Sequence, residues 1–154
     1  MKVIDSITVK DDITLISLCD CPADISHIAR VFDMITKAGI DVDMISQFPP
    51  AGTNSGFSFS VSDSDFVSVL SIASTLRTEQ PKIKISVSSG NSKITVSGDS
   101  MPGTPGVAAK VFAAAAKAQA DIRMITTSET EIAMLVIKAD AESAVNAIEQ
   151  AFAD

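Results

Sequence analysis

Short stretches of alternating polar and apolar residues are separated along this chain by stretches with apolar residues at helical spacing. The alternation in Ile13–Cys19 and in Lys93–Ser97 predicts two half-buried strands. Each strand is followed by a proline-containing loop and then by the pattern of an amphipathic helix. The apolar positions of these two helices are Ile25, Ile28, Ala29, Phe32 and Ile35 in the first, and Ala108, Ala109, Phe112 and Ala115 in the second.

The pattern then predicts two more strands and one more helix in each half of the chain. The second helix begins at an acidic cap, near Ser62–Asp63 in the first half and near Asp140 in the second. The additional strands are Ile40–Phe48 and Phe57–Val61 in the first half, and Asp121–Ser128 and Ile132–Ile137 in the second.

The two halves are copies of one unit. A shift of about 80 positions aligns Pro22–Gln47 with Pro102–Thr127 without a gap. Two copies of one supersecondary structure account for the identities. The identical pairs are Pro22/Pro102, Ala29/Ala109, Val31/Val111, Phe32/Phe112, Lys37/Lys117, Ala38/Ala118, Asp41/Asp121, Met44/Met124 and Ile45/Ile125.

The strands of the two copies do not match in number. Lys82–Val87 gives the first copy a β-α-β-β-α-β order, whereas the second copy lacks a strand after its last helix. Val3–Val9 is a strand without a copy, so we expect it to fill the vacant place. The predicted domains are therefore residues 11–90 and a discontinuous domain of residues 91–154 plus 1–10. The polar run Ser88–Ser92 reads as the linker between them.

Composition excludes several classes of function. Twelve Lys and Arg against nineteen Asp and Glu give a net charge of -7, which disfavours nucleic acid and anionic lipid as partners. No apolar run approaches the roughly 18 residues of a membrane span, and the N-terminus lacks the pattern of a secretory signal. Two cysteines one residue apart make no disulfide framework. These features predict a cytoplasmic protein.

Few residues suit catalysis or metal binding. His27 is the single histidine, so a histidine cluster is impossible and a serine triad would depend on it alone. A residue of the helix surface or of an interface is the alternative role for it. Cys19 and Cys21 are expected on the same face of a strand, as packed or idle thiols. We expect no catalytic residues, no metal and no cofactor. Met101–Gly106 could bind a small carboxylate at the following helix start or could merely turn the chain.

At these residues the chain resembles the paired ACT domains at the C-terminus of aspartate kinases. Met101–Lys110 is similar to the family's Met-x-x-x-Pro-Gly-Val-Ala-Ala loop and helix start. Asp121–Glu129 is similar to its Asn-Ile-x-Met-Ile-Ser-Thr-Ser-Glu, and Ala38–Gln47 to its Ala-Gly-Ile-Asn-Val-Asp-Met-Ile-x-Gln. The resemblance covers about Val3 to Phe152.

The resemblance implies an α+β fold of two ferredoxin-like ACT domains, with helices on one face of antiparallel sheets and the N-terminal strand completing the second domain. It implies a regulatory chain that senses an aspartate-family amino acid, lysine or threonine, for feedback control. A homodimer and a separate aspartate kinase catalytic subunit are the implied partners. The alternative is a free-standing ACT protein that binds another small ligand or regulates a different enzyme.

The family's ligand contacts fall on the loop before the first helix of each copy and on the following strand. The family's Asp-x-Pro-Gly in the first of these loops is replaced here by Ala23-Asp24-Ile25-Ser26, and a later Thr-Thr-Asp by Asn54-Ser55-Gly56, so the first pocket is altered. The ligand-binding residues implied by the resemblance are Ala23, Ile25, Ser26, His27, Asp41, Val42 and Gln47 in the first copy, and Gly106, Val107, Ala120, Asp121, Ile122, Ser128 and Glu129 in the second.

Overall fold

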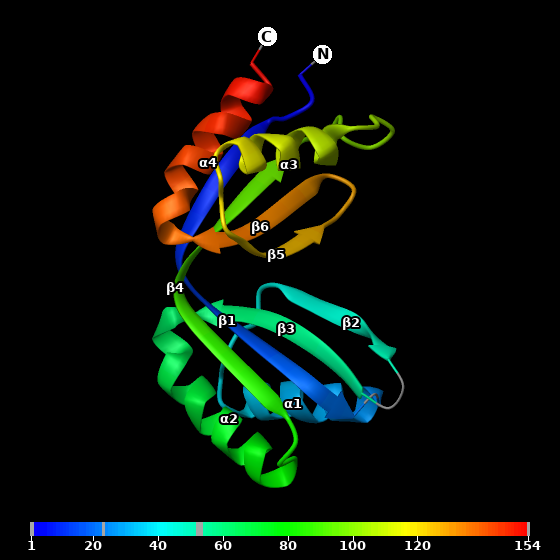
Figure 1. Cartoon of the computed structure of the whole chain (residues 1–154), viewed down its shortest axis with the longest axis vertical. Helices are drawn as coiled ribbons and strands as arrows, with labels where there is room; N and C mark the ends of the chain where they lie inside the picture. The colour runs from blue at the N-terminus through cyan, green and yellow to red at the C-terminus, as the bar shows by residue number, and fades with distance from the viewer. Residues whose placement is uncertain (1, 23, 52–53, 154) are drawn as a thin grey trace. The chain divides into compact units, whose positions relative to one another are not determined.

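The computed structural model describes residues 2–22, 24–51 and 54–153. Strands and helices alternate along them as the repeat predicts (Figure 1). The elements are β1 (Ser6–Pro22), α1 (Ile25–Lys37), β2 (Ile45–Ala51), β3 (Asn54–Ser62), the 3-10 turn η1 (Asp63–Asp65), α2 (Phe66–Glu79), β4 (Lys84–Ser97), α3 (Val107–Lys117), β5 (Ile122–Thr127), β6 (Glu131–Ile137) and α4 (Lys138–Ala151).

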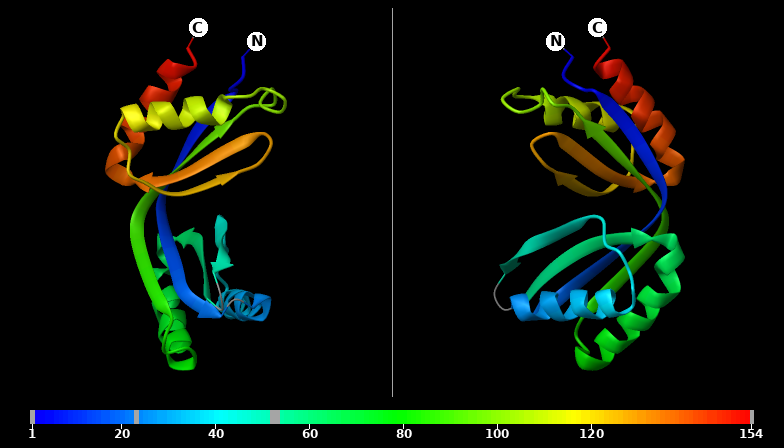
Figure 2. Two further views of the ribbon diagram at one scale, coloured as in Figure 1. Left: turned by 45° about the vertical axis from the view of Figure 1, so that its right-hand side comes forward. Right: turned by 180° about the vertical axis from the view of Figure 1, so that it is seen from behind.

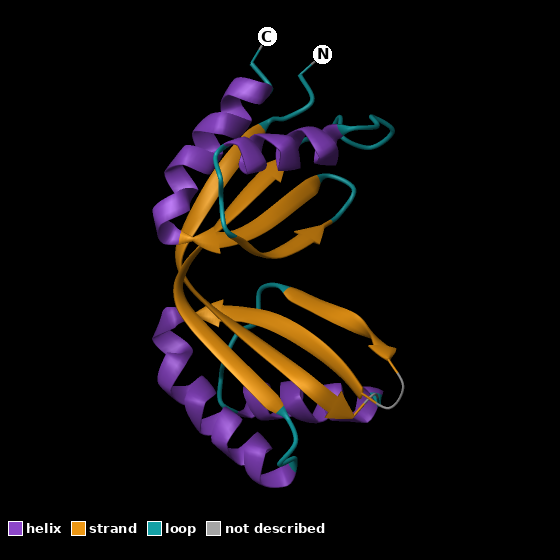
Figure 3. Cartoon of the chain, viewed as in Figure 1, coloured by secondary structure: helices purple, strands orange, loops and turns teal. Residues whose placement is uncertain are grey.

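The chain divides into two units, each with its own part of one six-stranded sheet and its own pair of helices. The first unit is Asp12–Ser89, and the second is Met1–Asp11 with Gly90–Asp154. The strand order β2-β3-β1-β4-β6-β5 gives the first unit a sheet of β2-β3-β1-β4 and the second a sheet of β1-β4-β6-β5. In each unit both helices cover one face of the sheet (Figures 2 and 3). The predicted α+β fold is confirmed, including the N-terminal strand that completes the second copy.

Two long strands replace four shorter predicted ones. β1 joins the expected strands Val3–Val9 and Ile13–Cys19 into one, and β4 does the same for Lys82–Val87 and Lys93–Ser97. Ser88–Ser92, predicted as a linker, does contain the boundary between the two units, but it is part of the strand β4. Strand hydrogen bonds use backbone groups, so a polar run continues a strand when it has neighbouring strands on both sides.

The core of the first unit lies between its sheet and the helices α1 and α2. Ile16 pairs with Phe59 and Leu18 with Phe57 across the antiparallel β1–β3 ladder, which places all four side chains on the helix-facing side. The buried residues of this core are Ile16, Leu18, Cys21, Val31, Ile35, Ile40, Phe57, Phe59, Val61, Val69, Leu76 and Ile83.

The second unit repeats this core with smaller side chains. Ile94 pairs with Met134 and Val96 with Ile132 across β4–β6. Helices α3 and α4 contact each other on the same face of this sheet (Figure 2). The buried residues are Ile4, Ile94, Val96, Met101, Val107, Val111, Ala114, Ala115, Ile132, Met134, Val136, Ala141, Ala144 and Ile148.

Helices α1 and α3 end in the same backbone conformation and hydrogen-bond pattern, eighty positions apart. Gly39 has a φ of 73° and its N–H donates to Thr36 O at 3.0 Å, while Ile40 N–H donates to Ile35 O at 3.1 Å. Gln119 takes the place of Gly39, with a φ of 55° and a bond from its N–H to Ala116 O at 2.9 Å. Glycine adopts this left-handed conformation without a steric penalty and glutamine does not.

Two boundaries differ from the predictions. β2 begins at Ile45 rather than Ile40, because the Ile40 N–H closes the end of α1. α4 begins at Lys138, and the carboxylate of Asp140 accepts the backbone N–H of Asp121 at 2.9 Å instead of capping the helix. Ser62, predicted near the start of the second helix, caps the 3-10 turn η1 that precedes α2, since its Oγ accepts from Ser64 N–H at 3.3 Å, and α2 itself has no side-chain cap.

Cys19 and Cys21 do not share a face, contrary to the expectation. The β1–β3 register shifts by one residue between Leu18 and Cys21, and Asp20 has a φ of 55°. This bulge turns Cys21 into the core and leaves Cys19 exposed. Burial, followed by the nearby Cys19 and Asp20, raises the pKa of the Cys21 thiol to about 11.

Candidate functional site

The start of α3 in the second unit is open to a ligand. Gly106 precedes the helix with a φ of 90°, and no side chain caps the first turn. A Cβ added at Gly106 would have no atom within 4 Å, so the space that a side chain would enter there is open. The first-turn N–H groups of a helix lack partners within the helix and carry a partial positive charge. This position therefore suits a small carboxylate.

A groove of about 580 Å³ surrounds this helix start. Two lysines, Lys2 and Lys110, line it, although the net charge of the chain is -7. The Nζ of Lys110 lies 4.5 Å from the ring centroid of Phe152, a cation–π contact that fixes the side chain at the groove. The groove is lined by Lys2, Val3, Ile4, Thr104, Pro105, Gly106, Val107, Lys110, Phe152 and Ala153.

Gly106 and Val107 are predicted site residues that line this groove, and Thr104 and Pro105 belong to the loop considered as a carboxylate site. The other lining residues were not predicted. Lys110 lies one turn after Gly106 on α3, a spacing that could have indicated it. Lys2 and Phe152 come from opposite ends of the sequence, and only the completed fold brings them to the start of α3. The repeat carries no signal for them.

The equivalent helix start in the first unit is occupied by the chain itself. The Asp24 carboxylate accepts the N–H of Ser26 at 3.0 Å and caps α1. This backbone hydrogen bond lowers the pKa of Asp24, since it stabilises the charged form. Ile25 is 74% exposed at the first helical position. Ala23 lies outside the described residues. A ligand carboxylate at α1 would have to compete with Asp24.

His27 lies at the start of α1, on the face of the helix that packs against the sheet. Its side chain is 8% exposed, and its ring meets that of Phe57 edge-on, with centroids 6.4 Å apart. Burial lowers the pKa of His27, and the carboxylate of Glu79 offsets part of this effect. Gln47, exposed on β2, pairs directly with Phe57 across the ladder. The fold thus brings both Gln47 and His27 next to Phe57.

Asp41 and Val42 lie at the other end of the first unit. They follow the C-terminus of α1, where Asp41 is exposed and Val42 packs against the core. α1 has 13 residues and is about 20 Å long at ~1.5 Å per residue. One amino-acid ligand cannot reach both ends of such a helix.

The second unit separates its residues in the same way. Ser128 and Glu129 form the exposed turn between β5 and β6, and Thr130 O accepts from Gly98 N–H at 2.9 Å near the loop that leads to α3. Ala120, Asp121 and Ile122 lie beyond the opposite end of α3. The carboxylate of Asp121 is already paired with Arg123 at 2.9 Å. Residues expected to share one ligand therefore belong to opposite ends of a unit.

The described residues hold no group of three or more His, Cys, Asp and Glu side chains that could bind a metal ion. Among the helices in the described ranges, none is long and apolar enough to cross a membrane.

Comparisons with known proteins point to one family. Residues 94–152 match the family model of the ACT domain. Aspartokinase 2 of Bacillus subtilis (strain 168) is 29% identical over 150 residues, which are 97% of this chain and 36% of that protein. The chain therefore spans about a third of the length of the curated relatives that it matches.

Two solved structures match over their whole length. The ligand-free regulatory subunit of aspartate kinase from Thermus thermophilus has a TM-score of 0.87 and 29% identity, covering 99% of this chain and 100% of that one. A chain of the aspartokinase alpha and beta subunits has a TM-score of 0.86 and 29% identity, covering 97% and 98%. These matches confirm the resemblance to the ACT domains of aspartate kinases.

Proposed function

We propose that this chain, which resembles the ACT regions of aspartate kinases along its whole length, is an amino-acid-binding regulatory module for feedback control of an aspartate kinase. Its effector is an aspartate-family amino acid, lysine or threonine. The observation that carries the proposal is the uncapped start of α3, with open space at Gly106 and with Lys110 and Lys2 lining its groove.

The positive charge of this groove is complementary to the carboxylate of an amino acid. The N–H groups of the first turn of α3 and the ammonium of Lys110 take the carboxylate. The ligand ammonium then needs carbonyl or carboxylate oxygens. Asp121 and Glu129 are the acidic residues expected to bind ligand in this copy. Asp121 is separated from Gly106 by the length of α3, which has 11 residues, about 17 Å at ~1.5 Å per residue.

This separation supports a homodimer as the binding species. A second copy of the chain would supply Asp121, which one copy places too far from its own Gly106. Ligand binding would then strengthen assembly, because the ligand contacts both copies at once.

The partner that this chain regulates is a separate catalytic chain. The regulatory subunit from Thermus thermophilus matches from end to end, and another matching chain comes from a structure of aspartokinase alpha and beta subunits. Both matches support a partner chain of a different kind. We therefore assign this chain no enzymatic activity of its own and a cytoplasmic location beside the kinase. The ACT domains are residues 11–90, and residues 91–154 plus 1–10.

A second function is favoured by one observation in the first unit. The Asp24 cap on α1 fills the position of a ligand carboxylate, so the two copies are not equivalent. A free-standing ACT protein that binds another small ligand, or that regulates a different enzyme, would accommodate this difference.

Thermal unfolding of the full chain with each of the twenty amino acids separates the two functions. Circular dichroism is the readout, since the chain has no Trp or Tyr. An effector at about 100 times its Kd adds ~2.7 kcal/mol, which raises Tm by about 5–10 °C at this chain length. A rise confined to lysine, threonine or a related amino acid supports the kinase module. A rise with unrelated amino acids supports the free-standing function.

Lys110→Met tests the groove and Lys117→Met serves as its control. Methionine keeps most of the apolar stem and removes the charge. Lys117 lies on the same helix but outside this groove. We expect the effector-induced rise in Tm to shrink in Lys110→Met and to persist in Lys117→Met. An equal response of the two variants would contradict the assignment of the groove.

A further inference from the structure

His27 is a polar side chain buried without a complete set of partners. It is the third residue of α1 and 8% exposed, and its Nε2 has no hydrogen-bond partner among the described residues. The ring lies edge-on to Phe57, whose ring also contacts Phe32 at 5.9 Å and Phe59 at 6.2 Å between centroids. A neutral imidazole fits such an aromatic environment, because it carries one N–H donor and no charge.

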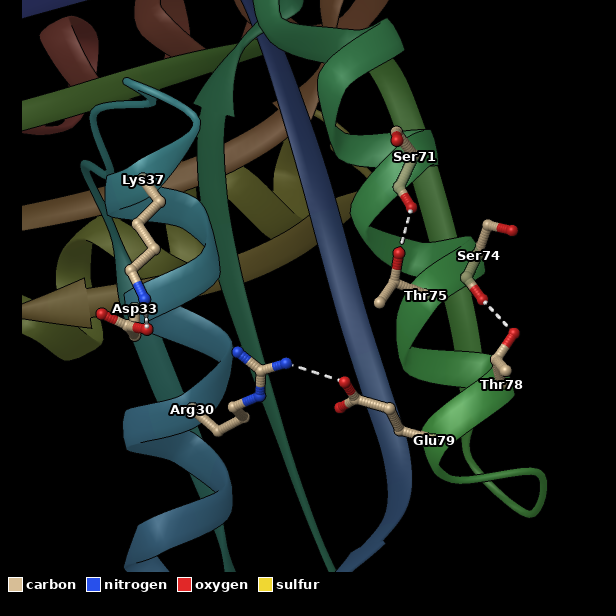
Figure 4. A network of polar contacts seen from close by, with 8 residues as sticks. All are labelled: Arg30, Asp33, Lys37, Ser71, Ser74, Thr75, Thr78 and Glu79. Atoms are coloured by element: carbon tan, nitrogen blue, oxygen red, sulfur yellow. Dashed lines mark hydrogen bonds and ion pairs between the residues drawn. The ribbon is translucent and has the colours of Figure 1, made fainter.

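The carboxylate that acts on the His27 ring and the acidic residues nearest to it in the sequence are already engaged. Glu79, at the end of α2, is the carboxylate that acts on the ring. It accepts a hydrogen bond from Nη2 of Arg30 at 2.7 Å (Figure 4). Asp24, at the start of α1, accepts from Ser26 N–H. On β1, Asp20 is paired with Lys84 at 3.1 Å.

β3, which presents Phe57 to the ring, has no charged residue in its sequence. A protonated imidazole has two N–H donors and a positive charge. Burying it unpaired is unfavourable, so the ring must reach water or draw Glu79 away from Arg30. His27 belongs to the first turn of α1, so we expect either movement to disturb that turn.

We propose that His27 is an acid-sensitive contact that controls the start of α1: the neutral ring holds this turn against Phe57, and uptake of one proton from solvent releases it. The regulatory meaning of this contact rests on the proposed function, in which Ile25, Ser26 and His27, at the start of α1, are ligand-binding residues of the first copy. A fall in pH then releases this helix start while the second copy keeps its groove.

The single histidine of the chain makes the test direct. The imidazole signals in NMR spectra of the full chain, without any amino acid, report His27 alone between pH 7.5 and 4.5. We expect one titration with a midpoint below 6.5, the ordinary histidine value, because burial disfavours the charged ring. The amide signals of Ser26 and Ile28 should move with the same midpoint. A midpoint at or above 6.5, or amides that do not follow the ring, would overturn the proposal.

Two variants identify the groups involved. His27→Gln keeps a polar side chain that does not titrate, and the amide transition should disappear in it. Glu79→Gln removes the attraction of the carboxylate, so the midpoint of His27 should fall further. Glu149→Gln, on α4 of the second unit, is the matched control and should leave the midpoint unchanged. If His27→Gln does not fold, the shift in Glu79→Gln decides the question.

Failure of this proposal is distinguishable from failure of the proposed function. The titration needs no ligand, so a chain that binds no amino acid can still show the coupled transition of the ring and the α1 amides. A chain that binds an effector while His27 titrates at its ordinary value overturns the acid-sensitive contact and leaves the regulatory function intact.

Discussion

Gly98→Ala should detach the N-terminal segment from the second unit. Gly98 follows β4, and a Cβ at this position would overlap the carbonyl oxygen of Val3 and lie 3.2 Å from Cα of Ile4. These neighbours are backbone atoms, which cannot turn away as the end of a side chain can. Residues 3–5 must therefore move as a piece.

The size of the destabilisation follows from the interactions that residues 3–5 make with the second unit. Ile4 is 6% exposed and part of the core, and burying such a side chain contributes about 1.5–3 kcal/mol. Asp5 N–H donates to Ser97 O at 2.8 Å, and the Asp5 carboxylate accepts from Asp99 N–H at 2.8 Å. Each bond contributes about 1 kcal/mol. Since part of this contact survives a displacement, we expect a loss of about 2–4 kcal/mol in the free energy of unfolding, or about 5–15 °C in Tm.

Hydrogen exchange gives the local readout beside urea or thermal unfolding. The Asp5 amide should lose protection in Gly98→Ala. Gly103→Ala is the control, because it lies in the same connection with a φ of 73° and no atom within 4 Å of its Cβ. That change strains only its own backbone, by about 1–2 kcal/mol, and should leave the Asp5 amide protected. Unaltered protection of Asp5 in Gly98→Ala would refute the reasoning, whatever happens to Tm.

Three further predictions follow from local features. Gln119→Gly relieves the left-handed residue at the end of α3 and should raise the free energy of unfolding by about 1 kcal/mol, measured by urea denaturation; no gain would show that the side chain stabilises this turn. At pH 8 the Cys19 thiol should react rapidly with a chromogenic disulfide and the Cys21 thiol should not. Cys19 is exposed, while burial raises the pKa of Cys21 to about 11. A fast phase that survives in Cys19→Ser would contradict this. The free energy of unfolding should decrease as pH falls below 6.5, because the unfolded chain binds a proton at His27 before the folded chain does. The lowered pKa of Asp24 adds its own loss only below 3.8, so urea denaturation at pH 7.5 and 5.5 isolates the histidine; an equal slope in His27→Gln would assign the decrease to another group.

The fold was predictable because the sequence contains two copies of the same pattern of strands and helices. Strand alternation is weak evidence in one copy, but Phe32 and Phe112, or Lys37 and Lys117, keep their places in both. The unmatched N-terminal strand then has only one vacant position to fill. The strand at Ser88–Ser92 was missed because this run is polar, and side-chain polarity does not report which backbone groups are paired within β4.

The candidate site was only partly predictable. Gly106 could be identified from a motif, since a helix start without a side chain is a local property. Lys2 and Phe152 could not, because they reach Gly106 only through the closure of the second unit by β1 and α4. The bulge between Leu18 and Cys21 also left no sequence signal, and it reversed the expected orientation of one cysteine.

Mapping a bound amino acid onto the backbone amides of the full chain tests the regulatory assignment most directly. Nitrogen–proton correlation spectra would be recorded while lysine or threonine is added, beginning with the amino acid that raises Tm most. The account predicts that the amides of residues 106–110 shift together and saturate, and that they do so less in Lys110→Met than in Lys117→Met. Saturable shifts confined to the start of α1, or spectra unchanged by both amino acids, would contradict the assignment of the α3 groove as the effector site.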